Sequence, residues 1–542
     1  MPTHEVTNQV PPLFDYNLFN CDRALREAME REGAAWARER AEKLGATLGR
    51  EETIEWGFAA NNNPPVLHTH DARGERLDEV KFHPAWHALM NLSVSNGLHN
   101  LPWAEPRAGA HVARAGLFFL SSQNEAGHGC PISMTYASVP ALRRQESVAR
   151  VWEPRIASMH YEPLLKPADQ KPGVLLGMAM TEKQGGSDVR ANTTRAQPAG
   201  AGGPGAEYRI TGHKWFCSAP MCDAFLVLAQ APGGLSCFLL PRFTPDGRRN
   251  RFYLQRLKNK LGNRSNASSE VEFDEAYAQL IGQEGRGVRT IVEMVNHTRL
   301  DCTLGSSGLL RAATVQAVHH VRHRAAFGKL LVDQPLMQNV VADVALESEA
   351  ATVLAMRLAR AYDRDDEAEA RFRRIATAVA KYWVCKRAPV AIGEALECLG
   401  GNGFVEDSVL PRLYRESPLN SIWEGSGNVI ALDVLRAIEH EGGTMDALLA
   451  EIDLGRGADR RFDAYAAAIR DDWKPLAADL PLARRLVERL ALALQASLVV
   501  RFSPGYVADA FCVSRLQGDR GQAYGTLPRG VECAKIVERA LV

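Results

Sequence analysis

The sequence predicts an α+β protein in which a helical block, a β-domain, a helical bundle and a helical tail follow one another. Apolar residues recur at helical spacing in the first and last parts of the chain, whereas short β-prone runs separated by glycine-rich turns fill the middle. The length of 542 residues gives room for a large core and about three or four modules.

The first block, residues 1–172, is predicted to be mostly helical. "CDRALREAMEREGAAWARERAEKLG" and "HVARAGLFFLSSQNEAG" carry apolar residues at helical spacing. The proline-bearing stretches "NNNPPVLHTHD" and "YEPLLKPADQKPG" are expected to be loops between the helices.

Residues 173–280 are predicted to form a compact antiparallel β-domain of hairpins. The expected strands are "EYRITGHKWFCSA", "AFLVLAQAP", "LSCFLLPRF", "FYLQRL" and "SSEVEFDEA". The string "GAGGPG" at 200–205 fits the dinucleotide fingerprint, but it leads into a strand and not a helix, so we interpret it as a hairpin tip.

Long amphipathic helices with short connections predict a helical bundle over residues 281–440. After Gly442 and Gly443, a further helical domain is expected over residues 441–542.

Bulk composition excludes several classes of protein. Lysine plus arginine equals aspartate plus glutamate, at 64 each, so no global charge indicates nucleic acid or membrane. No basic and apolar leader opens the chain, and no apolar run is long enough to span a bilayer. The ten cysteines are scattered singly, which is typical of reduced thiols. We therefore expect a cytoplasmic protein with no membrane association.

The stretch "NSIWEGSGNVIALDVLRA", residues 420–437, sets one carboxylate, Glu424, between a tryptophan and a run of small residues. One interpretation is a helix start in which Ser426 or Asn428 caps the helix and Glu424 is solvated. The other is a catalytic base beside a cofactor whose rings approach the backbone so closely that only small residues fit.

Two motifs of the β-domain also allow two interpretations. "MTEKQGGSD" either presents N–H and hydroxyl groups to a heteroaromatic ring edge or is an ordinary loop. "GHKWFCSAP" either sets an aromatic wall beside the hydroxyl of Ser218, as a flavin would need, or packs its aromatic residues into a core.

Two motifs of the bundle could contact phosphate. Arg324, in "RHRAAFGKLL", offers a rigid fork suited to a pyrophosphate, or it is a solvated residue at a helix end. Gly400 and Gly401, in "ECLGGNGF", form a helix C-cap or a point of phosphate approach.

Four histidines, His68, His70, His83 and His87, lie at metal-like spacing. Their loop setting, Pro84 and the lack of an H-E-x-x-H helix argue against zinc, and no metal is predicted.

Taken in chain order, T-E-x-x-G-G-S-D, K-W-F-x-S, T-R at 298–299, R-x-x-F-G, L-G-G-N-G-F and E-G-S-G-N resemble the acyl-CoA dehydrogenase flavoprotein family. The resemblance covers about residues 85–440. "KLGNRSNAS", "GGLSCF" and "SIWEGSGN" look like an outlying branch of that family, the alkylation-response proteins.

The resemblance implies FAD as cofactor, an acyl-CoA substrate and Glu424 as the catalytic base. It implies that the cofactor-binding residues are Met180, Thr181, Gly186, Ser187, Phe216, Cys217, Ser218, Arg324, Phe327, Gly400, Gly401, Trp423, Gly425, Ser426, Gly427 and Asn428. It also implies that the substrate-side residues are Ser187, Thr298, Arg299 and Trp423. Trp423 stands where the family usually has a tyrosine, and its larger side chain would narrow the acyl channel. We therefore expect weak acyl-CoA dehydrogenase activity on a short or branched acyl group, such as isovaleryl.

Arg324 and Phe327 are expected to contact the FAD of a neighbouring subunit, so the resemblance implies a homotetramer made of two dimers. For residues 441–542 it implies binding of double-stranded DNA in the response to alkylation. That segment holds 14 basic and 14 acidic residues, and Arg485 and Arg489 share one helical face. The alternatives are an ordinary metabolic acyl-CoA dehydrogenase with a structural tail, and a flavoprotein scaffold whose Glu424 is idle.

Overall fold

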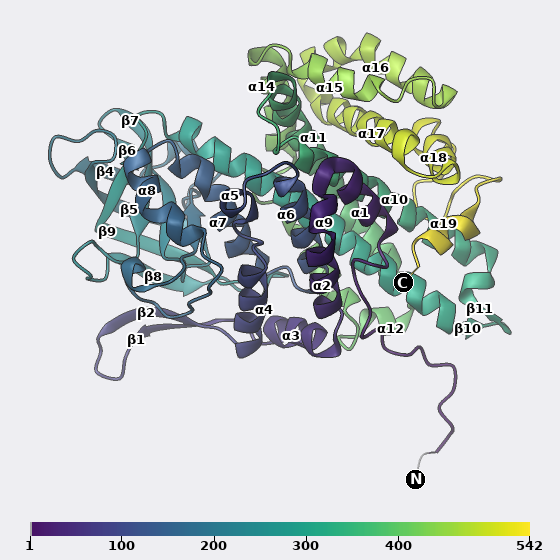
Figure 1. Ribbon diagram of the computed structural model, residues 1–542, viewed down its shortest axis with the longest axis horizontal. Helices are drawn as coiled ribbons and strands as arrows, with labels where there is room; N and C mark the ends of the chain where they lie inside the picture. Colours follow the sequence, from purple (N-terminus) through teal and green to yellow (C-terminus); the bar gives the residue numbers. More distant parts are fainter. Residues whose placement is uncertain (1–2, 542) are drawn as a thin grey trace. The chain divides into compact units, whose positions relative to one another are not determined.

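The computed structural model of the chain describes residues 3–541 and divides into two compact units (Figure 1). The first, unit 1, comprises Met1–Ile54, Arg107–Asn124 and Arg299–Val542, and the second, unit 2, comprises Glu55–Pro106 and Glu125–Thr298.

Unit 1 is helical apart from one short hairpin. Its helices are α1 (Arg23–Met29), α2 (Arg38–Leu48), α6 (Ala110–Asn124), α10 (Pro335–Arg360), α11 (Glu367–Glu397), α12 (Gly401–Phe404), α13 (Leu410–Glu416), α14 (Gly427–His440), α15 (Thr444–Asp453), α16 (Arg460–Ala478), α17 (Ala483–Phe502), α18 (Gly505–Phe511) and α19 (Cys533–Arg539). The hairpin strands are β10 (Ala325–Ala326) and β11 (Lys329–Leu330). The chain passes between the units at four points, two of which lie within the helices α3 (Glu51–Asn62) and α9 (Gly287–His323).

Aspartates cap the N-termini of several of these helices, at the points where a loop sequence gives way to helical periodicity. Asp366 accepts from the N–H of Glu369 at the start of α11, and Asp459 accepts from the N–H groups of Arg461 and Phe462 at the start of α16. Each carboxylate satisfies amides that the helix itself leaves without a partner. Acidic residues in the first turn also suit the positive end of the helix dipole.

The C-terminal helices share the core of the bundle. Helix α17 packs against α10, α11, α14, α15 and α16, and its apolar face, which includes Leu490 and Leu494, is fully buried. The segment after residue 440 is therefore an integral layer of unit 1, because its removal would expose the apolar faces of α10 and α11.

Unit 2 is built on one sheet. Its elements are β1 (Val66–His70), β2 (Arg76–Lys81), α4 (Pro84–Ser95), α5 (Leu101–Ala104), α7 (Gly129–Leu142), α8 (Glu146–Ile156), β3 (Leu176–Ala179), β4 (Arg195–Pro198), β5 (Glu207–Ser218), β6 (Ala224–Ala231), β7 (Gly234–Pro241), β8 (Phe252–Leu257) and β9 (Ser268–Ile281). The strand order is β3-β6-β4-β5-β9-β7, β7 also pairs with β6, and β8 pairs with β9. The pairings among β6, β4, β5, β9 and β7 thus close a ring, which leaves little unpaired edge.

The α+β fold class is confirmed, with two corrections. The middle sheet is not purely antiparallel, because β3 runs parallel to β6 with Leu176 opposite Ala224. A parallel pair needs a long crossover, and the chain supplies one by forming β4 and β5 between these strands. The stretch around residues 61–71, expected as a loop, contains strand β1, which pairs with β2 as an antiparallel hairpin.

The expected strands of residues 207–281 are all present, and 200–205 does lie at the tip between β4 and β5. Strand β6 is buried along nearly its whole length, which agrees with its continuous apolar run. Among residues 3–541, no helix is long and apolar enough to cross a membrane.

Candidate active-site loops

The loop that carries Glu424 precedes α14 and adopts a backbone conformation that side chains rarely take. Glu424 has a φ of 58° and Gly425 a φ of 106°. A non-glycine residue in this region costs on the order of 1 kcal/mol or more, and such strain persists only where surrounding contacts impose it. The side chain of Glu424 is half-buried.

Two cations impose this conformation by binding three consecutive carbonyls. Lys381 on α11, only 1% exposed, donates from Nζ to the carbonyl of Trp423 at 2.8 Å and to that of Gly425. Arg299 on α9 donates from Nε to the carbonyl of Glu424 at 2.9 Å. The loop is thus held through the carbonyls of its backbone.

A carboxylate behind the loop orients Arg299. Asp433 on α14 accepts from Arg299 Nη1 at 2.7 Å and from Arg374 Nη2 at 3.0 Å. Burial alone raises the pKa of Asp433, but Arg299 and Arg374 outweigh it and lower the pKa. Asp433 therefore remains charged at neutral pH and keeps the guanidinium of Arg299 directed at the loop.

Trp423 is fixed at its indole. Its Nε1 donates to Asn420 Oδ1 at 2.9 Å, and Asn420 in turn donates to Ser306 Oγ at 3.1 Å. The side chain before the candidate base therefore has a defined position.

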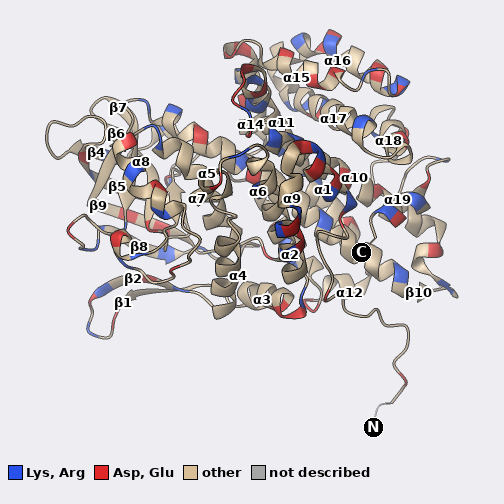
Figure 2. Ribbon diagram, viewed as in Figure 1, with Lys and Arg blue, Asp and Glu red and all other residues tan. Residues whose placement is uncertain are grey.

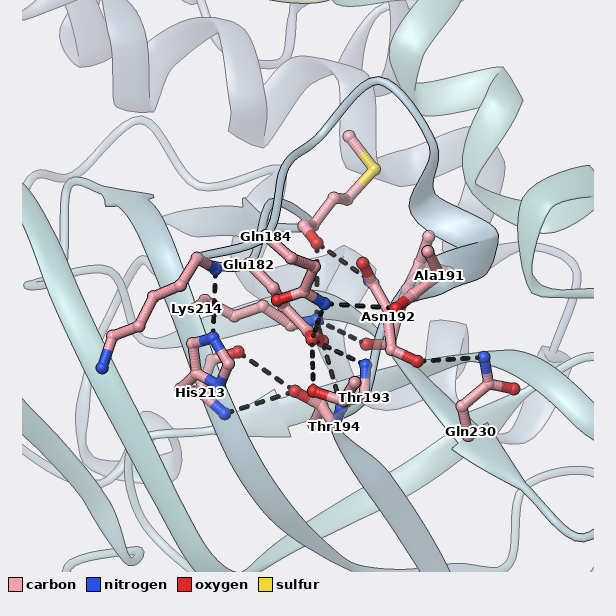
Figure 3. A network of polar contacts seen from close by, with 12 residues as sticks. Glu182, Gln184, Ala191, Asn192, Thr193, Thr194, His213, Lys214 and Gln230 are labelled. Atoms are coloured by element: carbon pink, nitrogen blue, oxygen red, sulfur yellow. Dashed lines mark hydrogen bonds and ion pairs between the residues drawn. The ribbon is translucent and has the colours of Figure 1, made fainter.

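In unit 2, the loop from Met180 to Asp188 is organised around the carboxylate of Glu182, which is fully buried (Figure 3). Lys214, 1% exposed on β5, donates from Nζ to Glu182 Oε1 at 2.8 Å. Thr193 donates its N–H at 2.7 Å and its hydroxyl at 3.0 Å to Oε2, and Gln184 Nε2 donates to the same oxygen at 2.8 Å.

Burial by itself raises the pKa of Glu182, but the Lys214 ammonium and the donors around the carboxylate lower it overall. The pair is therefore ionised in the folded protein, and its charges are satisfied by hydrogen bonds on both sides, since Lys214 also donates to the Leu228 carbonyl at 2.8 Å.

Donors from neighbouring segments hold the first two carbonyls of this loop. Asn192 Nδ2 donates to the Met180 carbonyl at 2.9 Å, and the N–H of Trp215 donates to the Thr181 carbonyl at 2.8 Å. Gly186 lies directly against the Thr181 side chain, because a Cβ added at Gly186 would be 2.3 Å from Thr181 Oγ1. Ser187, next along the loop, is exposed.

The end of β5 presents an exposed aromatic ring next to a hydroxyl. Phe216 is 50% exposed, Ser218 is half-buried two residues on, and Cys217 points inward. Burial raises the pKa of Cys217 to about 12, so its thiol stays protonated. An exposed ring beside a hydroxyl donor fits the face and edge of an isoalloxazine ring better than it fits a core strand.

The remaining motifs lie at exposed turns of unit 1. Phe327 is 98% exposed at the tip of the β10–β11 hairpin, where it and Gly328 have φ values of 52° and 77°. Arg324, just after α9, donates to the Asn8 carbonyl. Gly400 and Gly401 are exposed after the end of α11, and an added Cβ at either would meet nothing within 4 Å.

The structure thus brings together the predicted residues within each unit. Met180, Thr181, Gly186, Ser187, Phe216, Cys217 and Ser218 gather in unit 2, whereas Trp423, Glu424, Gly425, Ser426, Gly427 and Asn428 gather with Arg299 in unit 1. Thr298 is buried on α9 and donates its hydroxyl to the Val295 carbonyl at 3.0 Å.

Sequence reasoning missed the charged residues that hold these loops. Lys381 and Lys214 were visible as single lysines in apolar stretches, "ATAVAKYWVC" and "GHKWFCS", and such lysines are buried only when they have partners. No local sequence pattern indicates the roles of Asp433 and Arg374, because their contacts join distant parts of the chain.

The two arginines proposed for DNA differ in their surroundings. Arg489 forms an ion pair with Asp472 at 2.8 Å, whereas Arg485 is exposed. Basic and acidic residues are mixed along α16 and α17, whereas the charged residues of α15 are all acidic (Figure 2). Among residues 3–541, no group of three His, Cys, Asp or Glu side chains is arranged to hold a metal ion.

Comparison with known proteins agrees with these features. Residues 285–439 and 177–276 match the C-terminal and middle domains of acyl-CoA dehydrogenases, and residues 8–163 match the adaptive response protein AidB N-terminal domain. The chain is 48% identical to the candidate acyl-CoA dehydrogenase AidB of Escherichia coli K12, over 94% of both chains. It is 32% identical to acyl-CoA dehydrogenase family member 11 of Caenorhabditis elegans, over 72% of this chain and 63% of that protein.

Two solved structures share the fold. The C. elegans protein ACDH-11 in complex with C11-CoA superposes with a TM-score of 0.85 at 25% identity, covering 95% of this chain and 94% of that one. The apo form of Bd2924 superposes with a TM-score of 0.82 at 27% identity, covering 92% of this chain and all of that one.

The chain belongs to the acyl-CoA dehydrogenase family. Its N-terminal block and its similarity to the E. coli protein along nearly its whole length place it in the AidB branch. Membership implies FAD as the cofactor, and the residues described above fit it. Glycines leave room beside the backbone at 400–401, an exposed ring stands beside a hydroxyl at the end of β5, and small residues follow Glu424.

Proposed function

We propose that the protein is an FAD-dependent dehydrogenase of short or branched acyl-CoA thioesters, with Glu424 as its catalytic base. The observation that carries this proposal is the imposed backbone of Glu424, since strain of this kind is kept where geometry matters for function. When bound, FAD supplies the acceptor for the hydride that leaves the β-carbon.

In this reaction the Glu424 carboxylate takes the proton from the α-carbon as the Cα–H bond breaks. With FAD bound, the β-hydrogen would leave with the electron pair of its bond to Cβ, and the electrons of the broken Cα–H bond would form the Cα=Cβ double bond, so the cofactor would take up the two electrons that the acyl group loses. The backbone N–H of Glu424 donates to the thioester carbonyl and stabilises the charge that develops there.

The fixed indole of Trp423 supports the preference for a short or branched acyl group, because it occupies room beside the base. Glu424→Gln, which keeps size and removes the base, should retain FAD and lose turnover of a branched short-chain acyl-CoA by at least about 10²-fold. Equal turnover in the two proteins would remove Glu424 from the mechanism.

We further propose that the protein assembles as a homotetramer, cytoplasmic in location, in which Arg324 and Phe327 reach the FAD of a neighbouring subunit. A bulky aromatic residue held at positive φ and 98% exposed supports a contact that a single chain does not make. Phe327→Asp should lower the mass measured by light scattering and also weaken FAD binding. A variant with unchanged mass and FAD affinity would refute the contact.

The third part of the proposal is binding of duplex DNA by residues 441–542 in the response to alkylation, supported by the similarity to AidB and by the exposed Arg485. The pairing of Arg489 with Asp472 and the burial of α17 in the core favour the alternative, a metabolic dehydrogenase with a structural tail.

Point substitutions separate these two, because truncation would expose the core. Arg485→Glu should weaken duplex binding measured by anisotropy and reduce its salt dependence, whereas Arg489→Glu should have a smaller effect since Arg489 is already neutralised. Failure of the parent protein to bind duplex at low salt would leave the metabolic alternative.

A further inference from the structure

Two cations converge on the first residue of α14, three residues after Glu424. A methyl group added at Gly427 would lie 2.8 Å from Lys386 Nζ, on α11, and 2.8 Å from Arg484 Nη2, on α17. The backbone at the start of α14 therefore lies directly against both charged groups, which would have to move to admit a larger residue at Gly427. Ser426 begins the helix without a side-chain cap.

Neither cation is neutralised. In the described part of the chain, Lys386 and Arg484 form no ion pair with a carboxylate, and the polar contact of Lys386 is Ser421 Oγ at 3.5 Å. Both lie near the ring of Tyr382, at 5.5 and 5.8 Å from its centroid. Burial and the charges of Arg484 and Lys381 lower the pKa of Lys386, which shows that positive charges are crowded here.

Two pairs of arginines elsewhere in unit 1 each share a carboxylate. Arg357 and Arg501 both pair with Glu451, and Arg387 and Arg515 both pair with Glu347. Lys386 and Arg484 repel each other, and the positive end of the α14 dipole, a helix of 14 residues, adds to the repulsion. An anion with more than one negative charge would relieve the repulsion among Lys386, Arg484 and the N-terminus of α14.

We propose that Lys386 and Arg484 bind the diphosphate of FAD, an inference that rests on the proposed function. Gly425 and Gly427 bring the backbone close to the ligand, Arg484 offers a planar fork to two phosphate oxygens, and Lys386 offers a point charge. Arg484 lies outside the residues that match the dehydrogenase domains, 285–439. The C-terminal segment therefore takes part in holding the cofactor, in addition to any role with DNA.

The test measures FAD affinity of the deflavinated full-length protein from the quenching of flavin fluorescence at several salt concentrations. Lys386→Met and Arg484→Met should each raise the Kd for FAD about tenfold, the scale of one lost charged hydrogen bond, and reduce its salt dependence. Arg484→Lys should restore part of the affinity. Lys43→Met, on an exposed residue of α2, is the matched control and should bind FAD as the parent does.

Inorganic pyrophosphate provides a second readout. It should raise the Tm of the parent apoprotein and have little effect on the Lys386→Met, Arg484→Met double variant. Because Arg484 is exposed and methionine fills the space of the Lys386 stem, both variants should fold, which far-UV circular dichroism checks.

Parental FAD affinity and salt dependence in both single variants would overturn the inference. So would a loss of duplex DNA binding in Arg484→Met with FAD binding intact, since the anion would then be nucleic acid. A parent protein that does not bind FAD would instead refute the proposed function, so the two failures are distinguishable.

Discussion

The two loops that carry the candidate site use buried charge in opposite ways. Around Glu424, cations on α9 and α11 bind three consecutive backbone carbonyls of the loop. Around Met180 and Thr181, the loop supplies the buried carboxylate itself, Glu182, which collects donors from β5 and from Thr193 and Gln184.

This difference has a consequence for substitution. The Glu424 loop depends on cations that are distant in sequence, whereas the Met180–Asp188 loop depends on the carboxylate of one of its own residues, Glu182. A carboxylate is a better acceptor than a carbonyl, so the second loop should be the more rigid of the two.

The largest effect should come from breaking the pair in unit 2. Lys214→Met leaves Glu182 charged and buried without its cation, and such a loss costs about 3–5 kcal/mol of unfolding free energy. Urea unfolding at neutral pH measures it. Glu182→Gln with Lys214→Met, which removes both charges, should recover much of the loss, and a single variant as stable as the parent would show that the pair is not ionised.

The next effect should come from Lys381→Met in unit 1. It leaves the carbonyls of Trp423 and Gly425 without donors, at about 1–3 kcal/mol each where they stay buried. The turnover rate should fall by more than the loss of folded protein explains, since displacing a base by about 1 Å can lower the rate about 10²-fold. Lys43→Met, on an exposed residue, is the control. A normal rate in Lys381→Met would mean that the loop keeps its shape without this cation.

The fold was predictable from the sequence, but the groups that hold the two loops were not. Periodicity and turn residues located strands β5 to β9 of the middle sheet, because each is a local pattern. The parallel pairing of β3 with β6 and the Arg299–Asp433–Arg374 cluster join residues far apart in sequence, and no local pattern encodes such contacts. Glu182 was quoted within its motif, yet its role emerged only from the position of Lys214 on another strand.

Acid should weaken the Glu424 loop through Asp433. Arg299 and Arg374 lower its pKa below the unfolded value of about 3.9, so its contribution is complete above that pH and is lost as the pH falls through the folded pKa. Asp433→Asn should therefore destabilise the protein at pH 7. Below about pH 4, the difference in unfolding free energy between this variant and the parent should become smaller. Unfolding curves at pH 7, 5 and 3 measure this, and a gap independent of pH would contradict the assignment.

The smallest effect should come from relieving the strain at Glu424 itself. Glycine adopts a φ of 58° without penalty, so Glu424→Gly removes a cost of about 1 kcal/mol, while the greater freedom of glycine in the unfolded chain returns part of it. We expect a net change of unfolding free energy between about zero and +1 kcal/mol, with turnover abolished. Glu424→Gln keeps the strained backbone and should not raise the unfolding free energy. The difference in unfolding free energy between the two variants therefore measures the cost of the backbone strain. If glycine destabilises the protein relative to glutamine, the side chain of Glu424 contributes to holding its loop, and the contrast drawn between the two loops fails.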